Sequence, residues 1–532
     1  MKRESGILYP VSSLPSRFGI GCFSKEAYEF IDFLKEAGQS YWQVLPLCQT
    51  GFGDSPYQSV SSFAGNPYFI DLETLIEEGL LTWEEVNGFD FGGDPEKVDY
   101  GALYNNRYTV LRIAFERFRS LENSDSHSAY HTEYQEYLEK EHYWLFDYAL
   151  YMALKKKYQG KSWTDWEDGE RLRRKRALTA VAKELSDDID FYRFLQFEFD
   201  RQWKKLHAYA TEQGIRIIGD IPFYVAMDSA ATWAHADIFR FDKDLVPTVV
   251  AGCPPDAFSP TGQLWGNPVY DWKKLKKNGY SWWINRFARN FEFYDVVRLD
   301  HFNGFAEYYE VPYGDETAEN GKVVKGPGID FFNAVKKELG DVAIIAEDLG
   351  NITPETEKLL EGTGYPGMKV LQFAFDPSES SYYLSYNHVK NAVVYTGTHD
   401  NTTTRAWIEQ CSDHDRDFAR RFIHSEYTDY GAFTWDFIRE AFRSVCDLCI
   451  IPIQDFLVKG EEARLNTPGT AQGNWQWRVV PNLLSHELAQ SIYDLTKTYG
   501  RLPKPDPVSG KDSKAAKAKS KKQVPDDILC KE

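Results

Sequence analysis

Acidic residues follow four short apolar runs in this sequence, at the point where each run ends. Asp220 follows "IRIIG", Asp300 follows "VVRL", Glu347 follows "VAIIA" and Asp400 follows "AVVYTGTH". An ionised carboxylate in an apolar interior costs on the order of several kcal/mol unless it is paired or used in chemistry. One acid at the end of a strand is usually a helix cap, but four in one chain indicate a functional site.

Two of these acids have surroundings that suit different protonation states. Arg298 and Asp300 are two residues apart on one strand, so their side chains leave the same face. The guanidinium is expected to keep Asp300 ionised, as a nucleophile requires. Glu347 stands at the lip of an apolar wall, where a carboxyl tends to keep its proton, as a general acid requires. Two carboxyl groups about 5 Å apart fit glycosyl transfer with retention through a covalent intermediate.

Acids at the ends of successive barrel strands are also typical ligands of Mg²⁺. Arg298 argues against a metal ion, because its charge lies on the same face as Asp300 and opposes a cation. His301 and His399 suit the recognition of hydroxyl groups better than magnesium, and Asp400 is placed to hold hydroxyls from a third direction. We therefore expect no metal and no organic cofactor.

Eight apolar, β-rich runs carry these residues, and amphipathic helical stretches separate most of them. The runs span residues 6–14, 41–47, 215–225, 295–302, 342–350, 368–375, 392–401 and 448–456. Apolar strands that alternate with helices are typical of a parallel sheet covered by helices. Eight such units predict an α/β fold, the (β/α)8 or TIM barrel, in which functional residues gather at the C-terminal ends of the strands. A doubly wound sheet is the alternative, but it requires no eighth strand.

Two long intervals between the strands predict insertions. Residues about 72–205, after the second strand, hold helical patterns and predict a large, mainly helical subdomain. Residues about 226–290, after the third strand, predict a smaller one whose Pro- and Gly-rich part, "GCPPDAFSPTGQLWGNPVYDW", forms an ordered loop. Residues 1–503 thus form the catalytic barrel with both insertions. Residues 504–532 are rich in Lys and poor in apolar residues, and we expect them to be disordered.

The composition argues against several classes of protein. A net charge of −19 disfavours nucleic-acid binding, which relies on clustered Lys and Arg. No stretch approaches the roughly 20 apolar residues of a membrane span, and the N-terminal residues lack a signal-peptide pattern. Seven cysteines with a single C-x-x-C, Cys446 and Cys449, predict neither a disulfide framework nor a zinc site. We expect a cytoplasmic protein, and its 16% aromatic content suits the binding of sugar rings.

Several motifs identify a family resemblance. In order and spacing, "RLDHF", "AEDLG" and "GTHDN" resemble the conserved regions of the α-amylase clan of glycoside hydrolases. More narrowly, the chain resembles the amylomaltases, the 4-α-glucanotransferases of glycoside hydrolase family 77. The stretches that carry this resemblance are "GILYPVSSLPSRFGIGCF", "SPYQSVSSFAGNPYFIDL", "GDIPFYVAMDSA", "PPDAFSPTGQLWGNPVYDW" and "RLNTPGTAQGNWQWR". The resemblance covers about residues 6–500.

The resemblance assigns the chemical steps to three carboxyl groups. It implies that Asp300 is the nucleophile, that Glu347 is the acid/base and that Asp400 stabilises the transition state. The implied reaction moves α-1,4-glucan segments between maltooligosaccharides, longer glucans or glucose as acceptors, by double displacement through a covalent glucosyl-enzyme. An α-amylase-type hydrolase with the same carboxylates is the main alternative. A glucan-binding protein on a degenerate barrel and a metal-dependent lyase are more distant ones.

A larger set of positions matches the substrate-binding residues of the family. They comprise a tyrosine that stacks on the sugar at the cleavage point, three partners that hydrogen-bond this sugar, an acid near the third strand, four residues of a loop over the cleft and one residue at its rim. In that order they are Tyr57; Arg298, His301 and His399; Asp220; Asp256, Gln263, Trp265 and Asn267; and Asn466.

Two positions depart from the pattern of the family. Many relatives have Tyr where this chain has Ala257, which leaves open how the loop over the cleft stacks on the acceptor. Many also have Arg where this chain has Asn303. We expect the second departure to affect the rim of the cleft more than the chemistry.

Overall fold

The computed structural model describes residues 2–51, 53–124, 129–255, 259–350, 352–375, 380–426 and 428–504. Within this part of the chain, eight parallel strands form one sheet in the order β10–β11–β12–β1–β2–β3–β6–β9. Their bounds are β1 (Glu4–Leu8), β2 (Tyr41–Gln43), β3 (Arg216–Ile221), β6 (Val296–Leu299), β9 (Ile344–Ala346), β10 (Gly367–Val370), β11 (Ala392–Tyr395) and β12 (Leu448–Pro452). Each strand overlaps one of the eight runs predicted from the sequence.

The sheet closes on itself, because the two ends of this strand order meet. The backbone N–H of Ala346 at the end of β9 donates to the carbonyl of Pro366, directly before β10, at 2.9 Å. The predicted (β/α)8 barrel is therefore confirmed. Most predicted runs were too long at their C-terminal ends. β6, for example, stops at Leu299, because the polar residues that follow turn over the mouth of the barrel instead of continuing the ladder.

Helices surround the barrel, so its strands are buried on both faces and have to be apolar throughout. The covering helices are α1 (Lys25–Glu36), α12 (Ser281–Phe293), α14 (Ile329–Leu339), α15 (Pro354–Thr363), α17 (Thr404–Gln410), α18 (Asp413–Ile423), α19 (Tyr430–Arg443) and α21 (His486–Thr498). In α1, the buried Ala27, Phe30, Ile31 and Leu34 recur at the spacing of one helical face. Among the described residues, no helix has the length and apolarity that crossing a bilayer would require.

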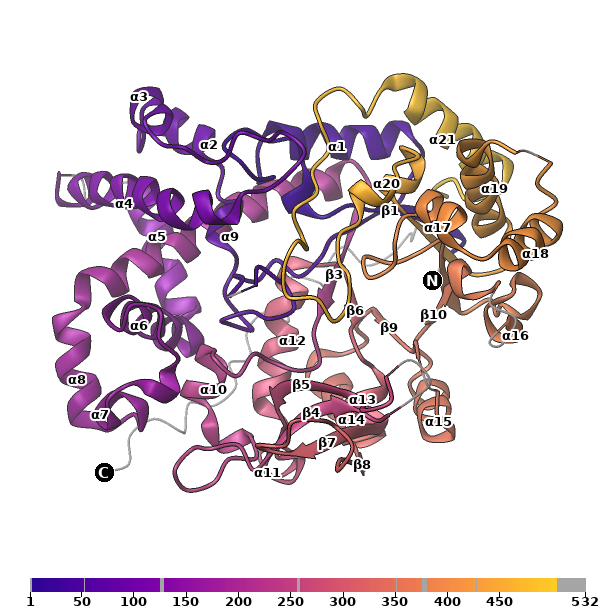
Figure 1. Cartoon of the computed structure of the whole chain (residues 1–532). Helices are drawn as coiled ribbons and strands as arrows, with labels where there is room; N and C mark the ends of the chain where they lie inside the picture. Colours follow the sequence, from indigo (N-terminus) through magenta and orange to yellow (C-terminus); the bar gives the residue numbers. More distant parts are fainter. Residues whose placement is uncertain are drawn as a thin grey trace, which may run out of the picture.

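A group of helices lies between β2 and β3 and stands to the left of the barrel in Figure 1. Its members are α2 (Leu72–Glu77), α3 (Trp83–Asn87), α4 (Tyr100–Ser124), α5 (Ala129–Lys140), α6 (His142–Lys157), α7 (Asp168–Arg171), α8 (Lys175–Glu184) and α9 (Ser186–Glu212). A buried ion cluster ties the group to the barrel. Arg289 of α12, fully buried, lies 3.3 Å from Glu141 before α6 and 2.9 Å from Asp200 of α9.

A second sheet, antiparallel and four-stranded, lies at the bottom of Figure 1 beside the barrel. Its order is β5 (Gln263–Pro268), β4 (Val249–Cys253), β7 (Glu307–Pro312) and β8 (Lys322–Lys325). The prediction of a loop over residues 263–268 is therefore wrong, and β7 and β8 were missed. One reason is that the pair β4–β7, which joins the consecutive pairs β4–β5 and β7–β8 into one sheet, links segments on either side of β6 in the sequence and leaves no local pattern.

Among the described residues, five further short α-helices remain. They are α10 (Ala230–Ala234), α11 (Trp272–Lys277), α13 (Asn303–Ala306), α16 (Ser380–Tyr383) and α20 (Ile453–Phe456). Of these, α13 matters most here, because it begins directly beyond the turn that follows β6 and leads into β7. Both the barrel and the second sheet therefore hold the turn that carries Asp300.

Candidate active site

Arg298 lies between two carboxylates at the mouth of the barrel. Arg298 on β6 pairs in register with Asp220 on β3, and its Nη1 donates to Asp220 Oδ2 at 2.6 Å. The same nitrogen donates to Asp300 Oδ1 at 3.0 Å. Arg298 and Asp220 are buried, whereas the Asp300 side chain is 27% exposed. The predicted Arg298–Asp300 pair is present, but the shorter bond goes to Asp220, which the sequence did not indicate.

Burial and neighbouring charges shift the pKa values of both Asp220 and Arg298 in this cluster. Burial raises the pKa of Asp220 to about 6, although the charge of Arg298 opposes the shift. Burial lowers the pKa of Arg298, but the carboxylates of Asp220 and Asp300 outweigh it and hold that pKa well above the usual range. The guanidinium is therefore a permanent positive charge beside the accessible carboxylate of Asp300.

Glu347 follows β9 and has both carboxyl oxygens held by backbone amides. The N–H of His301 donates to Oε2 at 2.7 Å, and the N–H of Leu349 donates to Oε1 at 3.0 Å. His301 adopts a left-handed backbone with φ of 50°, which is uncommon outside glycine. Burial raises the pKa of Glu347 to about 8, with a further contribution from the charge of Asp300. Glu347 therefore carries its proton at neutral pH.

Asp400 lies in the turn that follows β11, and its pKa is shifted in the opposite direction from that of Glu347. Its Oδ1 accepts a hydrogen bond from Asn466 Nδ2 at 2.7 Å, and its Oδ2 lies 3.4 Å from His399 Nε2. Burial alone would raise its pKa, but His399 and Asn466 hold the pKa of Asp400 well below its usual range. Asp400 is therefore a permanent anion.

Tyr57 joins the two sides of this site. Its hydroxyl donates to Asp220 Oδ2 at 2.9 Å and lies 3.4 Å from His399 Nδ1. Its ring stacks on the ring of His399, with centroids 4.9 Å apart and planes at 15°. The contacts thus run without a break from Asp300 through Arg298, Asp220, Tyr57 and His399 to Asp400.

Three of the predicted loop residues lie on strand β5 and not in a loop. Trp265 is 37% exposed, and its ring lies edge-on, 5.2 Å from the ring of His301. Gln263 is exposed and accepts from Trp265 Nε1, whereas Asn267 is buried and donates to the carbonyl of Val225 at 2.8 Å. Gln263, Trp265 and Asn267 are not among the residues that line the cavity described next. The predicted Asp256 and the departure at Ala257 lie outside the described residues.

A cavity of about 410 Å³ opens beside these acids. Five of the predicted residues line it: Tyr57, Asp300, His399, Asp400 and Asn466. The remaining lining residues were not predicted and are Gly53, Ser55, Gln58, Pro468, Gly469, Thr470, Ala471, Asn474 and Trp475. Most belong to "NTPGTAQGNW", in which the Gly-, Thr- and Asn-rich composition was a signal for a functional loop.

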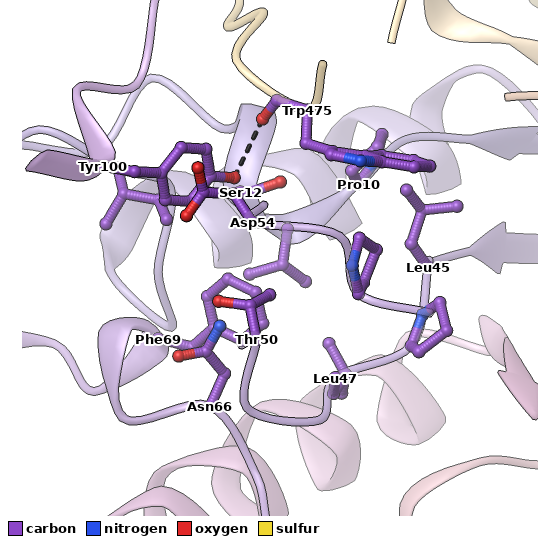
Figure 2. A pocket seen from close by; sticks show the side chains of 14 residues that line it. Pro10, Ser12, Leu45, Leu47, Thr50, Asp54, Asn66, Phe69, Tyr100 and Trp475 are labelled. Atoms are coloured by element: carbon purple, nitrogen blue, oxygen red, sulfur yellow. Dashed lines mark hydrogen bonds between the residues drawn. The ribbon is translucent and has the colours of Figure 1, made fainter. Parts of the chain in front are cut away.

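Trp475 forms one wall of this cavity and is held from behind. Its ring lies 5.8 Å from the ring of Tyr57 and 6.0 Å from that of His399. Figure 2 shows a second pocket that Trp475 also lines, where the hydroxyl of Tyr100 donates to the carbonyl of Trp475 at 2.9 Å. That pocket measures only about 20 Å³, which is room for roughly one water molecule. The aromatic wall is therefore firmly supported.

The metal-binding and cysteine expectations can be placed in the structure as well. Within the described ranges, no group of three or more His, Cys, Asp or Glu side chains is arranged to hold a metal ion. Cys446, just before β12, and Cys449, at the start of β12, are buried thiols.

Asn303, whose replacement we expect to affect the rim more than the chemistry, is partly buried and contacts the turn that follows β9. Its Nδ2 donates to the carbonyl of Leu349 at 2.9 Å, and its amide oxygen is buried. Leu349 is the residue whose N–H holds Glu347. Asn303 therefore contacts the residue that donates to the carboxyl group of Glu347.

Comparison with known proteins identifies clear relatives. The model of a protein family described as 4-alpha-glucanotransferase matches residues 9–483. The chain is 47% identical to a 4-alpha-glucanotransferase of Clostridium butyricum over 493 residues, which cover 92% of this chain and 99% of that protein. It is 44% identical to a 4-alpha-glucanotransferase of Thermus thermophilus over 507 residues, covering 94% of this chain and 100% of that protein.

Solved structures show the same likeness. An amylomaltase from Streptococcus agalactiae, solved in complex with acarbose, superposes with a TM-score of 0.90 at 38% sequence identity, covering 94% of this chain and all of that one. An amylomaltase from Corynebacterium glutamicum superposes with a TM-score of 0.73 at 18% identity, covering 94% of this chain and 75% of that one. At that identity the second likeness concerns the fold alone.

Proposed function

This chain belongs to the 4-alpha-glucanotransferase family, and from that membership we propose how its site transfers α-1,4-glucan segments between maltooligosaccharides. In the first step, a carboxylate oxygen of Asp300 attacks the anomeric carbon of the donor. Glu347 gives its proton to the departing glycosidic oxygen, the C–O bond breaks, and a glucosyl ester on Asp300 forms. The released glucan leaves with a free 4-hydroxyl.

The second step reverses these roles with a new acceptor. The Glu347 carboxylate takes the proton of the acceptor's 4-hydroxyl, the acceptor oxygen attacks the anomeric carbon of the glucosyl ester, and the bond from that carbon to Asp300 breaks and releases the carboxylate. Two inversions restore the α configuration. One observation carries this proposal: Asp300 is partly exposed beside the fixed cation Arg298, whereas Glu347 has a pKa raised to about 8 by burial. These are the states that a nucleophile and a general acid require.

The neighbouring side chains bind the sugar at the cleavage point. We propose that Asp400, held ionised by His399 and Asn466, binds its hydroxyls and stabilises positive charge at the anomeric carbon. Tyr57, half-buried on the ring of His399, offers the face on which the sugar stacks.

Transfer exceeds hydrolysis only if an acceptor sugar, and not water, occupies the site when the ester is attacked. The exposed ring of Trp265, beside His301, supports an acceptor position there. We propose maltooligosaccharides, longer α-1,4-glucans and glucose as acceptors. A cytoplasmic location is also a proposal, supported by the buried thiols of Cys446 and Cys449.

The decisive variant is Asp300→Asn, which keeps the shape of the side chain and removes the nucleophile. We expect turnover to fall by about four orders of magnitude or more, on the scale of losing a catalytic nucleophile. The fold and the binding of maltooligosaccharides should be retained. Asp341→Asn serves as the control and should be fully active, because this side chain is 87% exposed and lies between α14 and β9. Substantial residual transfer by the Asp300 variant would overturn the assignment.

A product analysis separates transfer from hydrolysis, which would use the same carboxylates. Maltotriose incubated with the enzyme should give glucose together with a ladder of oligomers longer than maltotriose. Products that only become shorter would mean that water is the acceptor, and the proposal of an acceptor-binding site at Trp265 would be wrong.

A further inference from the structure

Several hydrogen bonds around Glu347 connect the turn that follows β6 with the turn that follows β9. The N–H of His301 donates to the Glu347 carboxyl group at 2.7 Å, and the N–H of Phe302 donates to the Glu347 carbonyl at 3.1 Å. Besides that of Glu347, a second side chain also joins these turns: Asn303 Nδ2 donates to the carbonyl of Leu349 at 2.9 Å. The carboxyl group of Glu347 therefore depends on both turns for its position.

Leu349 is the less securely held of the two residues that donate to this carboxyl group. Its N–H donates to Glu347 Oε1 at 3.0 Å, and it precedes Gly350, which has a φ of 81°. Glycine permits the peptide between Leu349 and Gly350 to reorient at little steric cost. The hydrogen bond from Asn303 opposes this freedom, because it holds the carbonyl of the Leu349–Gly350 peptide. It thereby restrains the backbone of Leu349, whose N–H on the preceding peptide holds Glu347.

Asn303 itself is rigidly placed. It is the first residue of α13, and the N–H of Gly304 donates to the carbonyl of His301 at 3.0 Å, which closes the turn before the helix. Its amide oxygen is buried and has no hydrogen-bond partner among the described residues. Its interaction with the Leu349 carbonyl is therefore the side-chain hydrogen bond that holds it in this place.

We propose that Asn303 is a positioning residue for the acid/base Glu347: by holding the Leu349 carbonyl, it keeps the backbone of Leu349 in place, so that the N–H of Leu349 continues to donate to the carboxyl group and fixes that group for proton transfer. This inference rests on the proposed function of Glu347. It assigns to Asn303 a role in the first chemical step and not in binding the substrate.

The consequence for catalysis follows from geometry. Displacement of a catalytic group by about 1 Å lowers the rate by roughly 100-fold. Asn303→Leu keeps the size of the side chain and removes its donor, so kcat/KM for maltotriose should fall by about 10- to 100-fold. A weaker bond from Leu349 also removes stabilisation of the ionised carboxylate, which raises the pKa of Glu347. The alkaline limb of the pH profile of kcat/KM should therefore move to higher pH.

The test compares two donors that differ in their need for a proton. Maltotriose requires protonation of its leaving oxygen, whereas α-maltotriosyl fluoride releases fluoride without it, and kcat/KM for both reports formation of the glucosyl ester. Asn303→Leu should lower kcat/KM for maltotriose by 10-fold or more and that for the fluoride by less than about threefold. Asn320→Leu, the same change at an exposed site, should leave both within about twofold.

Glu347→Gln distinguishes failure of this inference from failure of the proposed function. If Glu347→Gln loses activity on maltotriose and keeps it on the fluoride, but Asn303→Leu loses both equally or neither, Asn303 does not act through Glu347. If Glu347→Gln itself fails to discriminate between the donors, the general-acid assignment is wrong. Discrimination by both variants, with the shifted alkaline limb in Asn303→Leu, supports the inference.

Discussion

Replacing Arg298 with leucine would remove a cation that pairs with both Asp220 and Asp300. The same guanidinium nitrogen is 2.6 Å from Asp220 and 3.0 Å from Asp300. The Arg298 side chain is 3% exposed and that of Asp220 is 0% exposed, so solvent replaces little of the lost interaction. Removing one partner of a buried ion pair typically destabilises a protein by about 3–5 kcal/mol. We expect a loss of this size at pH 8.

The loss should depend on pH in a direction that the structure determines. The pKa of Asp220 is already raised from 3.8 to about 6 by burial, and Arg298 holds it down. In the variant it rises further, so the folded protein keeps the proton on Asp220 to higher pH. A carboxyl group with a raised pKa contributes most stability below its unfolded pKa and loses it as pH rises through its folded pKa. The difference from wild type should therefore be small near pH 5 and largest near pH 8.

Urea-induced unfolding, followed by tryptophan fluorescence at both pH values, measures this difference. Arg298→Leu should also lose transfer activity, because Asp300 loses its partner. Adding Asp220→Asn removes the unpaired buried carboxylate, so the double variant should recover most of the stability at pH 8 but not the activity. An Arg298→Leu variant as stable as wild type at pH 8, or no recovery on adding Asp220→Asn, would contradict the role given to this ion pair.

Three further predictions concern the neighbouring groups. Because Glu347 has a pKa raised to about 8 and acts as the protonated acid, kcat/KM for maltotriose should fall as pH rises through about 8; a profile that is flat to pH 10 would contradict this role. Tyr57→Phe removes the hydroxyl bond to Asp220 but keeps the ring stacked on His399, so steady-state kinetics should show kcat lower by about 3- to 10-fold and KM nearly unchanged. Asn466→Ala removes the 2.7 Å bond to Asp400, so this carboxylate loses one of the groups that hold it in place and steady-state kinetics should show kcat/KM for maltotriose lower by about 3- to 10-fold; an unchanged kcat/KM would show that His399 suffices to hold Asp400.

The barrel was predictable from the sequence, because each of its strands is buried on both faces and leaves a continuous apolar run. β11, for example, is buried at every residue from Ala392 to Tyr395. The second sheet was not predictable in this way. β4 and β5 pair with each other but contain Gly252 and Gly266, which weaken the strand pattern. The pair of β4 with β7 joins segments that β6 separates in the sequence, so it leaves no local signal.

The residues of the candidate site were likewise predictable only where they leave a local feature in the sequence. The sequence alone determined which acids stand at strand ends, because a polar residue after an apolar run is a local feature, and its motifs indicated the family. It also indicated the Arg298–Asp300 pair, because residues two apart on a strand share a face.

Only the tertiary structure decided how these residues are connected. Tyr57, in the segment that follows β2, contacts Asp220 on β3 and His399 after β11. Asn303, at the start of α13 after β6, donates to Leu349 in the turn after β9. The distances along the chain between such partners carry no information about contact. Closure of the barrel places the ends of its strands around one mouth, and there burial and neighbouring charge, which no single segment contains, separate the pKa of Glu347 from that of Asp400.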